Sequence, residues 1–140
     1  MCIRDRLKKC WQGRLIAATR SGLTKKLPLL GSGDTSVVVQ PIWHAPGWHS
    51  YGAEQAFIKT LPGPDIELCS GLTQAMVRFA ARHEYAMSVE DVLARRSRLL
   101  FLDARLASEQ AVEVGRILLE ETGADPGVDA FLQLAKQYIL

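Results

Sequence analysis

Two histidines and three aromatic side chains lie close together in residues 43–52, where metal or nucleic-acid chemistry has to be considered first. His44 and His49 could share a metal ion, but the stretch holds no cysteine or acid to complete a ligand set. The rings could stack on nucleic-acid bases, but the stretch has no Lys or Arg to follow a phosphate backbone. Because amphipathic aromatic side chains favour interfaces, we favour a docking loop packed against another domain. Its expected contact residues, exposed in the isolated chain, are Trp43, Trp48 and Tyr51.

A glycine-containing stretch at residues 31–36, GSGDTS, invites comparison with a dinucleotide-binding loop. Ser36 occupies the position of the third glycine, and the residues that follow are β-branched and broken by proline, which does not predict a helix. Without a helix N-terminus there are no free N–H groups to hold a pyrophosphate. We therefore interpret the stretch as a turn.

His83 and Glu84 could form an acid–base pair. His83, however, falls on the apolar face of a predicted helix, where a hydrogen-bonded core histidine is the usual explanation. Glu84 follows directly and would point about 100° away from it. No nucleophile or cofactor loop accompanies the pair, so we favour a structural role for both residues.

The densest cationic cluster of the C-terminal half is RRSR at residues 95–98. Such a cluster could lie on a nucleic-acid recognition helix. Three acids lie close enough in the sequence to pair with these arginines, which favours a structural or solvated face. They are Glu90, Asp91 and Asp103. We expect Arg95 and Arg96 to fix helix–helix or domain–domain geometry by bidentate pairing.

The elements that would position these residues differ between the two halves of the chain. Residues 4–20 show a helical spacing of apolar side chains, and Gly22 reads as its stop signal. Residues 27–65 hold five of the six prolines, which predicts an irregular segment. Within it we expect a short strand over 36–40 and a helix over 53–61.

From residue 71 onward the pattern predicts four helices joined by short loops, and therefore a small antiparallel bundle of mainly α class. The first spans about 72–86. Ser88 and Asp91 resemble a capping box that begins a second helix running toward Leu100. Asp103 is the expected N-cap of a third, which Gly123 closes. Asp125 and Pro126 are expected to open the last helix.

Three apolar stripes are expected to face the core of this bundle. On the first helix the stripe comprises Met76, Phe79, Ala80, His83 and Met87. On the third it comprises Leu106, Ala107, Ala111, Val114, Ile117 and Leu118. On the last it comprises Val128, Phe131, Leu132, Ala135, Tyr138 and Ile139.

The bulk composition is that of an ordinary globular protein of 140 residues, with 48% apolar and 23% charged side chains. A net charge of +2 gives no global attraction to nucleic acid or anionic membrane. The three cysteines are too few and scattered for a disulfide framework or a zinc site, which suits a reducing cytosol. No apolar run approaches the roughly 20 residues of a membrane span, and no signal-peptide h-region is evident. We assign no catalytic, cofactor-binding or metal-binding residue.

Residues 82–105, RHEYAMSVEDVLARRSRLLFLDAR, carry a more specific signal. This run resembles the C-terminal helical domain of FAD-dependent glycerol-3-phosphate dehydrogenases and oxidases, with looser agreement from residue 50 to the last helix. Ser97 stands where a threonine is more usual in that family. The family's recurring positions are occupied here by Arg82, His83, Glu84, Glu90, Asp91, Leu93, Arg95, Arg96, Leu102, Asp103 and Ala104.

The resemblance implies that the parent enzyme binds FAD in an N-terminal Rossmann-type domain that is not present here. Such enzymes oxidise sn-glycerol 3-phosphate to dihydroxyacetone phosphate and pass electrons to quinone or oxygen. Since hydride chemistry belongs to the flavin, the fragment should be inactive by itself and bind no cofactor. Its expected partner is the flavin/substrate domain of the same chain, with a homodimer and peripheral membrane contact possible in the parent. We expect a cytoplasmic location or the inner face of the cytoplasmic membrane.

Four divisions of the chain follow from this interpretation. Residues 1–6 resemble a translated sequencing-adapter remnant and are expected to be non-native. Residues 7–30 would end the preceding domain, 31–65 would form the connecting docking segment, and 66–140 the C-terminal helical domain. Two other hypotheses stay open: a free-standing helical protein-interaction module, and a small nucleic-acid-binding helical domain, whose affinity would fall steeply with salt.

Overall fold

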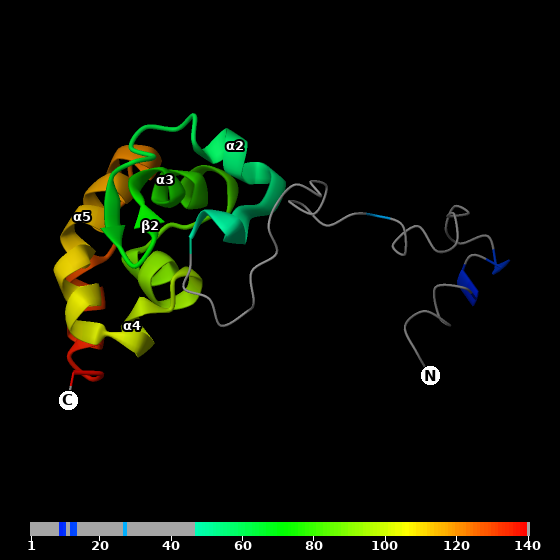
Figure 1. The fold of residues 1–140 in the computed structure, drawn as a ribbon. Coiled ribbons are helices and arrows are strands. Elements are labelled where there is room, and N and C mark those ends of the chain that lie inside the picture. Colours follow the sequence, from blue (N-terminus) through cyan, green and yellow to red (C-terminus); the bar gives the residue numbers. More distant parts are fainter. Residues whose placement is uncertain (1–8, 11, 14–26, 28–46, 140) are drawn as a thin grey trace.

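The structure, a computed structural model, describes residues 9–10, 12–13, 27 and 47–139. Over 47–139 the chain is mainly helical with one small sheet, so the predicted fold class is confirmed (Figure 1). The elements are η2 (Trp48–Glu54), α2 (Gln55–Ile58), β1 (Glu67–Cys69), β2 (Leu72–Thr73), α3 (Gln74–His83), η3 (Asp91–Arg96), α4 (Leu99–Leu102), α5 (Ala104–Thr122) and α6 (Val128–Ala135). Most of the helix expected over 4–20, the strand expected over 36–40 and Trp43 lie outside the described residues.

The helix expected over 53–61 is shorter than predicted and has a different beginning. The chain enters as the 3₁₀-helix η2, which is kinked at Gly52, where φ is 52°. It then continues as the single turn of α2. Ile58 of α2 is fully buried, so this turn is anchored in the core of the domain.

A two-stranded antiparallel hairpin, which the sequence analysis did not predict, precedes α3. Cys69 of β1 pairs with Leu72 of β2, which leaves Ser70 and Gly71 as a two-residue loop. Both have positive φ, 44° and 80°, as the tight primed hairpin turns require. Thr73 ends β2 and caps α3, because its hydroxyl accepts a hydrogen bond from Met76 N at 3.4 Å.

The first predicted helix ends earlier than expected. Instead of continuing to residue 86, α3 ends at His83, and Tyr85 adopts a left-handed backbone with φ of 58°. Ala86 N then donates back to Ala80 O at 3.0 Å. Two inward assignments are therefore wrong: His83 lies on the exposed surface, and 49% of Met87 is accessible.

The second predicted helix is broken. The Ser88–Asp91 capping box is confirmed, since Asp91 N donates to Ser88 Oγ at 3.2 Å and Ser88 N donates to Asp91 Oδ2 at 3.0 Å. The following turn is π-helical rather than α-helical, with Ser97 N bonded to Val92 O at 2.9 Å. Arg98 then adopts a φ of 58°, and the separate helix α4 begins after it. The prediction of one continuous helix running to Leu100 was therefore wrong.

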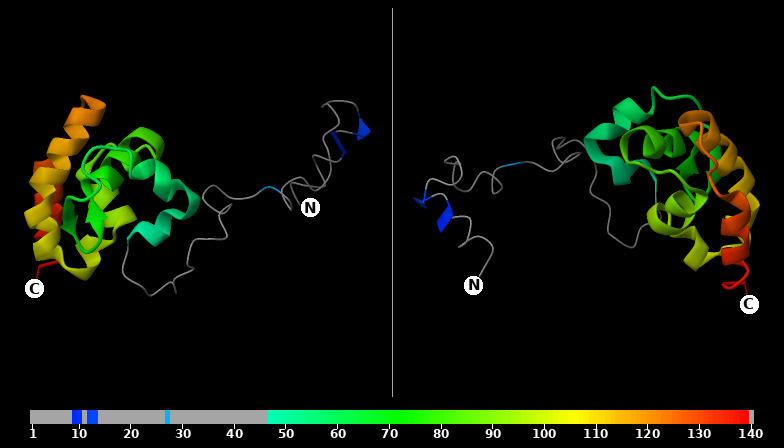
Figure 2. Two further views of the ribbon diagram at one scale, coloured as in Figure 1. Left: turned by 45° about the horizontal axis from the view of Figure 1, so that its top comes forward. Right: turned by 180° about the vertical axis from the view of Figure 1, so that it is seen from behind.

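The third predicted helix, α5, is as expected and forms the spine of the domain. Leu106 N donates to Asp103 Oδ1 at 3.0 Å, and Gly123 ends the helix with a φ of 70°, so both predicted caps are confirmed. Its stripe is fully buried apart from the half-buried Leu106. Helices α3, α4 and α6 all pack against α5. Figures 1 and 2 show η2 and α5 on opposite sides of α3.

The last helix begins two residues later than predicted. Gly127, with φ of 69°, occupies the N-cap of α6, while Asp125 Oδ1 accepts from Gly127 N at 2.9 Å in the preceding turn. The backbone oxygen of Pro126 accepts a hydrogen bond from Val89 N at 2.9 Å, so it is bonded to a distant segment of the chain. The helix ends at Ala135, so the inward assignment of Tyr138 and Ile139 was wrong: they are 46% and 37% exposed.

Candidate docking surface

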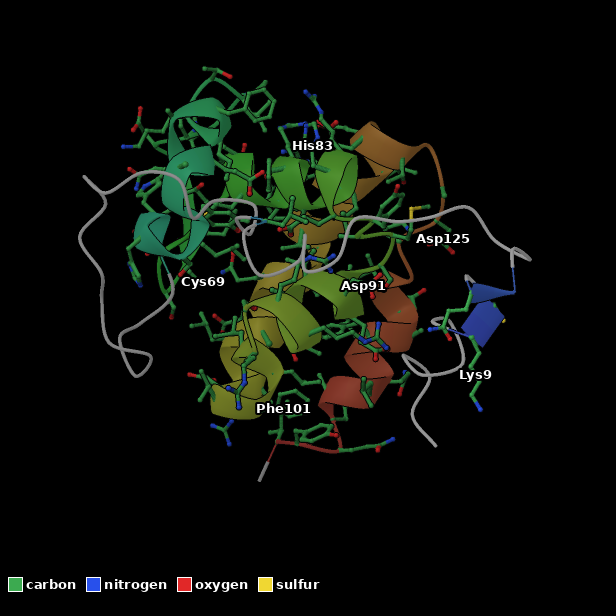
Figure 3. The ribbon with its side chains drawn as sticks, turned by 90° about the vertical axis from the view of Figure 1, so that its right-hand side faces the viewer. Lys9, Cys69, His83, Asp91, Phe101 and Asp125 are labelled. Carbon is green, nitrogen blue, oxygen red and sulfur yellow. The ribbon has the colours of Figure 1, made fainter. Side chains whose placement is uncertain are left out.

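The loop of residues 84–88, between α3 and η3, presents two large apolar side chains to solvent. Tyr85 is 89% exposed and Met87 is 49% exposed. The loop runs between His83 and Asp91, which both lie on the face shown in Figure 3. Five residues singled out in the sequence are brought together around it: His83, Glu84, Asp91, Arg95 and Arg96.

Arg96 holds the two ends of this loop together. Its Nε donates to Glu84 Oε2 at 3.0 Å, and its Nη2 donates to the backbone carbonyl of Glu84. Its Nη1 donates to the carbonyl of Asp91 at 3.1 Å. The planar guanidinium can satisfy three such acceptors at once, which a lysine could not do in the same geometry. Glu84 and Arg96 both stand out in the sequence, but their pairing with each other was not predicted.

Asp91 secures the loop from its other end. Its Oδ2 accepts hydrogen bonds from Met87 N at 3.1 Å, from Ser88 N at 3.0 Å and from the Ser88 hydroxyl at 2.9 Å. Arg95 donates to Asp91 Oδ1 and, at 2.7 Å, to Glu90. Desolvation alone would raise the pKa of the Asp91 carboxyl, but these hydrogen bonds outweigh it and lower that pKa. The predicted pairing with Glu90 and Asp91 is thus confirmed for Arg95, whereas the ion pair of Arg96 is with Glu84.

Asp103, the third acid expected to pair with these arginines, has a different role. Its carboxylate caps α5 through Leu106 N, and no ion pair with Arg95 or Arg96 is found within residues 47–139. It also borders a cavity of about 130 Å³ lined by Leu99, Leu102, Leu106, Cys69, Ser70 and Ser97. Ligand pockets span roughly 300–1,000 Å³, so this cavity is far too small for a flavin.

Aromatic side chains support the loop from η2 and α2. The ring of Tyr51 meets Phe79 edge-on at a centroid distance of 5.7 Å. His83 packs between Phe79 and Phe57, with centroid distances of 5.1 and 5.2 Å. Burial raises the pKa of Tyr51 to about 12, with a further contribution from nearby Glu84 and an opposing one from Arg96. His83 is thus an exposed member of an aromatic cluster and not a core histidine.

The two described aromatic residues that were expected to be exposed are partly covered by their own domain. Trp48 and Tyr51 both pack against the hydrophobic core, and Lys59 Nζ lies 5.3 Å from the centre of the Trp48 ring. Phe57 of α2, which is 48% exposed, adds apolar surface beside them, and the loop of residues 84–88 adds that of Tyr85 and Met87, which were not predicted as contact residues. Their signal was obscured because both fell inside or beside a predicted helix.

A second charged network joins α3 to α5 and was also missed. Arg78 donates to Glu121 at 2.5 Å and to Glu120 at 2.9 Å, and Arg82 reaches Glu121 with two further hydrogen bonds. The hydrogen bond from Arg82, together with that from Arg78, lowers the pKa of Glu121 against the effect of its desolvation. These acids lie about 40 residues from their partners, so no local spacing could have revealed the network.

The ionisable groups around the loop hold it in place. Within residues 47–139 and the few described residues before them, no group of three or more His, Cys, Asp or Glu side chains could hold a metal ion. No described helix is long and apolar enough to cross a membrane. The acids and arginines around the loop are occupied with one another and hold the backbone in place.

Fold and surface together define a small, mainly α-helical domain with a rigid, exposed loop. Residues 49–127, more than half of the chain, match the C-terminal domain of alpha-glycerophosphate oxidase, and the chain belongs to this family. It is also 40% identical over 68 residues to the mitochondrial glycerol-3-phosphate dehydrogenase of Schizosaccharomyces pombe. That alignment covers 48% of this chain but only 10% of the yeast protein. No solved structure matches. The resemblance found in residues 82–105 is thereby confirmed.

Proposed function

We propose that the chain is the C-terminal helical cap of an FAD-dependent oxidoreductase that converts sn-glycerol 3-phosphate to dihydroxyacetone phosphate. Quinone or oxygen would accept the electrons. The observation that supports this most directly is the family match over residues 49–127, together with the dehydrogenase named among its relatives. The cap would be an intrinsic part of that enzyme, which would lie in the cytoplasm or on the inner face of the cytoplasmic membrane.

The flavin would be held outside this domain. The cavity beside Leu102 is far too small for it, and the described acids and bases serve the backbone or one another. When bound in the parent enzyme, FAD would accept the hydride from the substrate carbon. The residues of this chain would contribute packing and orientation of the larger part, and the 140-residue chain alone would neither bind FAD nor oxidise glycerol 3-phosphate.

The test is to recover the reading frame upstream of the codon for Met1 from genomic DNA and to produce the full-length protein. We expect the frame to encode a flavin-binding domain, and the purified protein to lose its flavin absorbance anaerobically on addition of sn-glycerol 3-phosphate. Glycerol is the matched control, because it lacks the phosphate and should leave the absorbance unchanged. A stop codon just upstream, or a flavin that glycerol 3-phosphate does not reduce, would refute the proposal and favour a free-standing interaction module.

A further inference from the structure

We infer that the surface formed by Tyr85 and Met87 is the one through which this domain docks on the flavin-bearing part of its own longer chain. This inference rests on the proposed function for the identity of the partner. It relocates the expected docking contact from the aromatic residues of η2 to the loop of residues 84–88.

The first reason is that Tyr85 is strained and exposed at once. A φ of 58° is a conformation that glycine or asparagine adopts readily and that a bulky L-residue adopts at a cost. A buried tyrosine could offset this cost by packing, but Tyr85 is 89% exposed and its ring makes no ring–ring contact with a described aromatic side chain. The domain by itself therefore gains nothing from an aromatic ring at a position where asparagine would be less strained.

The second reason is that the loop is held in one conformation before any partner arrives. Arg96 binds the side chain and carbonyl of Glu84, and Asp91 accepts three hydrogen bonds from Met87 and Ser88. A surface that is already ordered loses little conformational entropy on binding. Aromatic side chains presented in this way are the residue type most often found at the energetic centre of interfaces.

The third reason is the position of the preceding chain. Forty-six residues precede Gly47, and they reach the described domain through η2, which packs on the C-terminal part of α3 through Tyr51 and Phe79. The aligned segment is only 10% of the yeast relative, and the family is that of a C-terminal domain, so a large body would precede it. That body would thus be tethered on the side of η2 and the loop, away from α5 (Figures 1 and 3).

The test uses one substitution in two proteins, the 140-residue chain and the full-length enzyme. Tyr85→Asn removes the ring and relieves the left-handed backbone. The control is Val112→Asn, which removes an apolar side chain that is 65% exposed on α5, at a helical position where Val and Asn have similar propensity. Tyr85→Phe keeps the ring and should behave as the wild type in both proteins.

In the 140-residue chain we expect Tyr85→Asn to leave the midpoint of thermal unfolding unchanged or higher. In the full-length enzyme we expect it to lower the midpoint of domain unfolding and to speed proteolytic release of the C-terminal domain at least tenfold. Val112→Asn should change neither the midpoint nor the release rate in the enzyme. Equal effects of Tyr85→Asn in both proteins, or no effect in the enzyme, would overturn the inference.

Two further readouts separate the remaining explanations. If Tyr85→Asn dissociates a dimer in light scattering without changing the release rate, the surface binds a second copy and the inference is wrong. Reduction of the wild-type flavin by sn-glycerol 3-phosphate reports on the proposed function alone. A full-length protein that is not reduced, but in which Tyr85→Asn still speeds release of the domain, would refute the activity and retain the docking surface.

Discussion

Gly115 provides the sharpest test of the packing between α5 and α6. It is a buried helical residue, and a Cβ atom added to it would lie 2.4 Å from Cγ2 of Val128 at the start of α6. The next nearest atoms, on Pro126 and Val89, would be at an ordinary 3.5 Å. The two helices therefore approach so closely at this point that Val128 alone excludes a methyl group.

Two opposing effects decide the outcome of Gly115→Ala. Replacing glycine by alanine inside a helix stabilises it by about 1 kcal/mol. Overpacking a core costs about 1–3 kcal/mol, and a contact of 2.4 Å against a stiff β-branched side chain belongs at the upper end of that range. We therefore expect a net loss of about 2 kcal/mol in the free energy of unfolding, or roughly 8–16 °C in Tm for a domain of this size.

The assay is urea unfolding followed by circular dichroism, with Val128→Ala and the double variant as partners in a double-mutant cycle. Once Val128 is truncated the clash is gone and only the helix propensity remains. Gly115→Ala should then stabilise the Val128→Ala protein by about 1 kcal/mol, although it destabilises the wild type. An increase in stability in both backgrounds, or a decrease in both, would show that the close approach at Val128 does not control the packing.

Two other predictions concern ionisable groups near the loop and the hairpin. Asp91→Ala should lower the free energy of unfolding by about 1–2 kcal/mol at neutral pH, as loss of a cap does. The folded-state pKa of Asp91 lies below its unfolded value, so the unfolded state binds more protons. The contribution of Asp91 to stability is therefore present above about pH 4 and is lost as the pH falls through the folded pKa. A destabilisation by Asp91→Ala that does not shrink in acid would contradict this. Burial, and to a lesser extent Glu67, raises the pKa of the Cys69 thiol, which is 7% exposed. Iodoacetamide should therefore label Cys69 far more slowly in the native chain than in urea at the same pH, as measured by peptide mass mapping, and equal rates would refute this.

The elements that the sequence predicted well depend on local interactions. Asp103 and Gly123 delimit α5, and Ser88 pairs with Asp91, because each interaction joins a side chain or a turn to backbone groups within four residues. The stripe of α5 was also predictable, since 19 residues of regular spacing average over individual exceptions. These signals give the caps and the spine of the domain, but not how the other helices begin and end.

The elements that the sequence did not predict depend on tertiary contacts or are too short to show a pattern. Asp125 and Pro126 satisfy every local rule for opening a helix, yet Pro126 O is bonded to Val89 N and the helix begins at Val128, with Gly127 as its N-cap. The two strands of the hairpin at Ser70 and Gly71 comprise five residues in all, too few to show an alternating pattern. In the first case a contact with a distant segment decides between local alternatives, and in the second the strands are too short to be recognised.

For the surface, the sequence identified the residues that hold the loop but not the residues that the loop presents. Glu84, Asp91 and Arg96 stand out because charged residues cluster there and resemble a family motif. Tyr85 and Met87 carry no such signal, since an apolar residue near a helical stripe is ordinarily read as part of the core. Only the early end of α3 shows that Met87 faces outward.

The early end of α3 also bears on why a tyrosine occupies position 85. Tyr85 and Arg98 are both non-glycine residues with φ of 58°, and each interrupts a helix that the apolar periodicity would continue. Left-handed backbone costs a residue of this kind roughly 1–2 kcal/mol. At Arg98 the break allows Leu99 and Leu100 to be buried in the core, which offsets that cost within the domain. At Tyr85 the break likewise lets Ala86 N donate to Ala80 O and buries the Ala86 side chain, so what the domain leaves unused is the tyrosine ring, which lies in solvent. Asparagine would adopt this backbone at less cost, so an exposed tyrosine at position 85 is consistent with the docking contact that we propose for its ring.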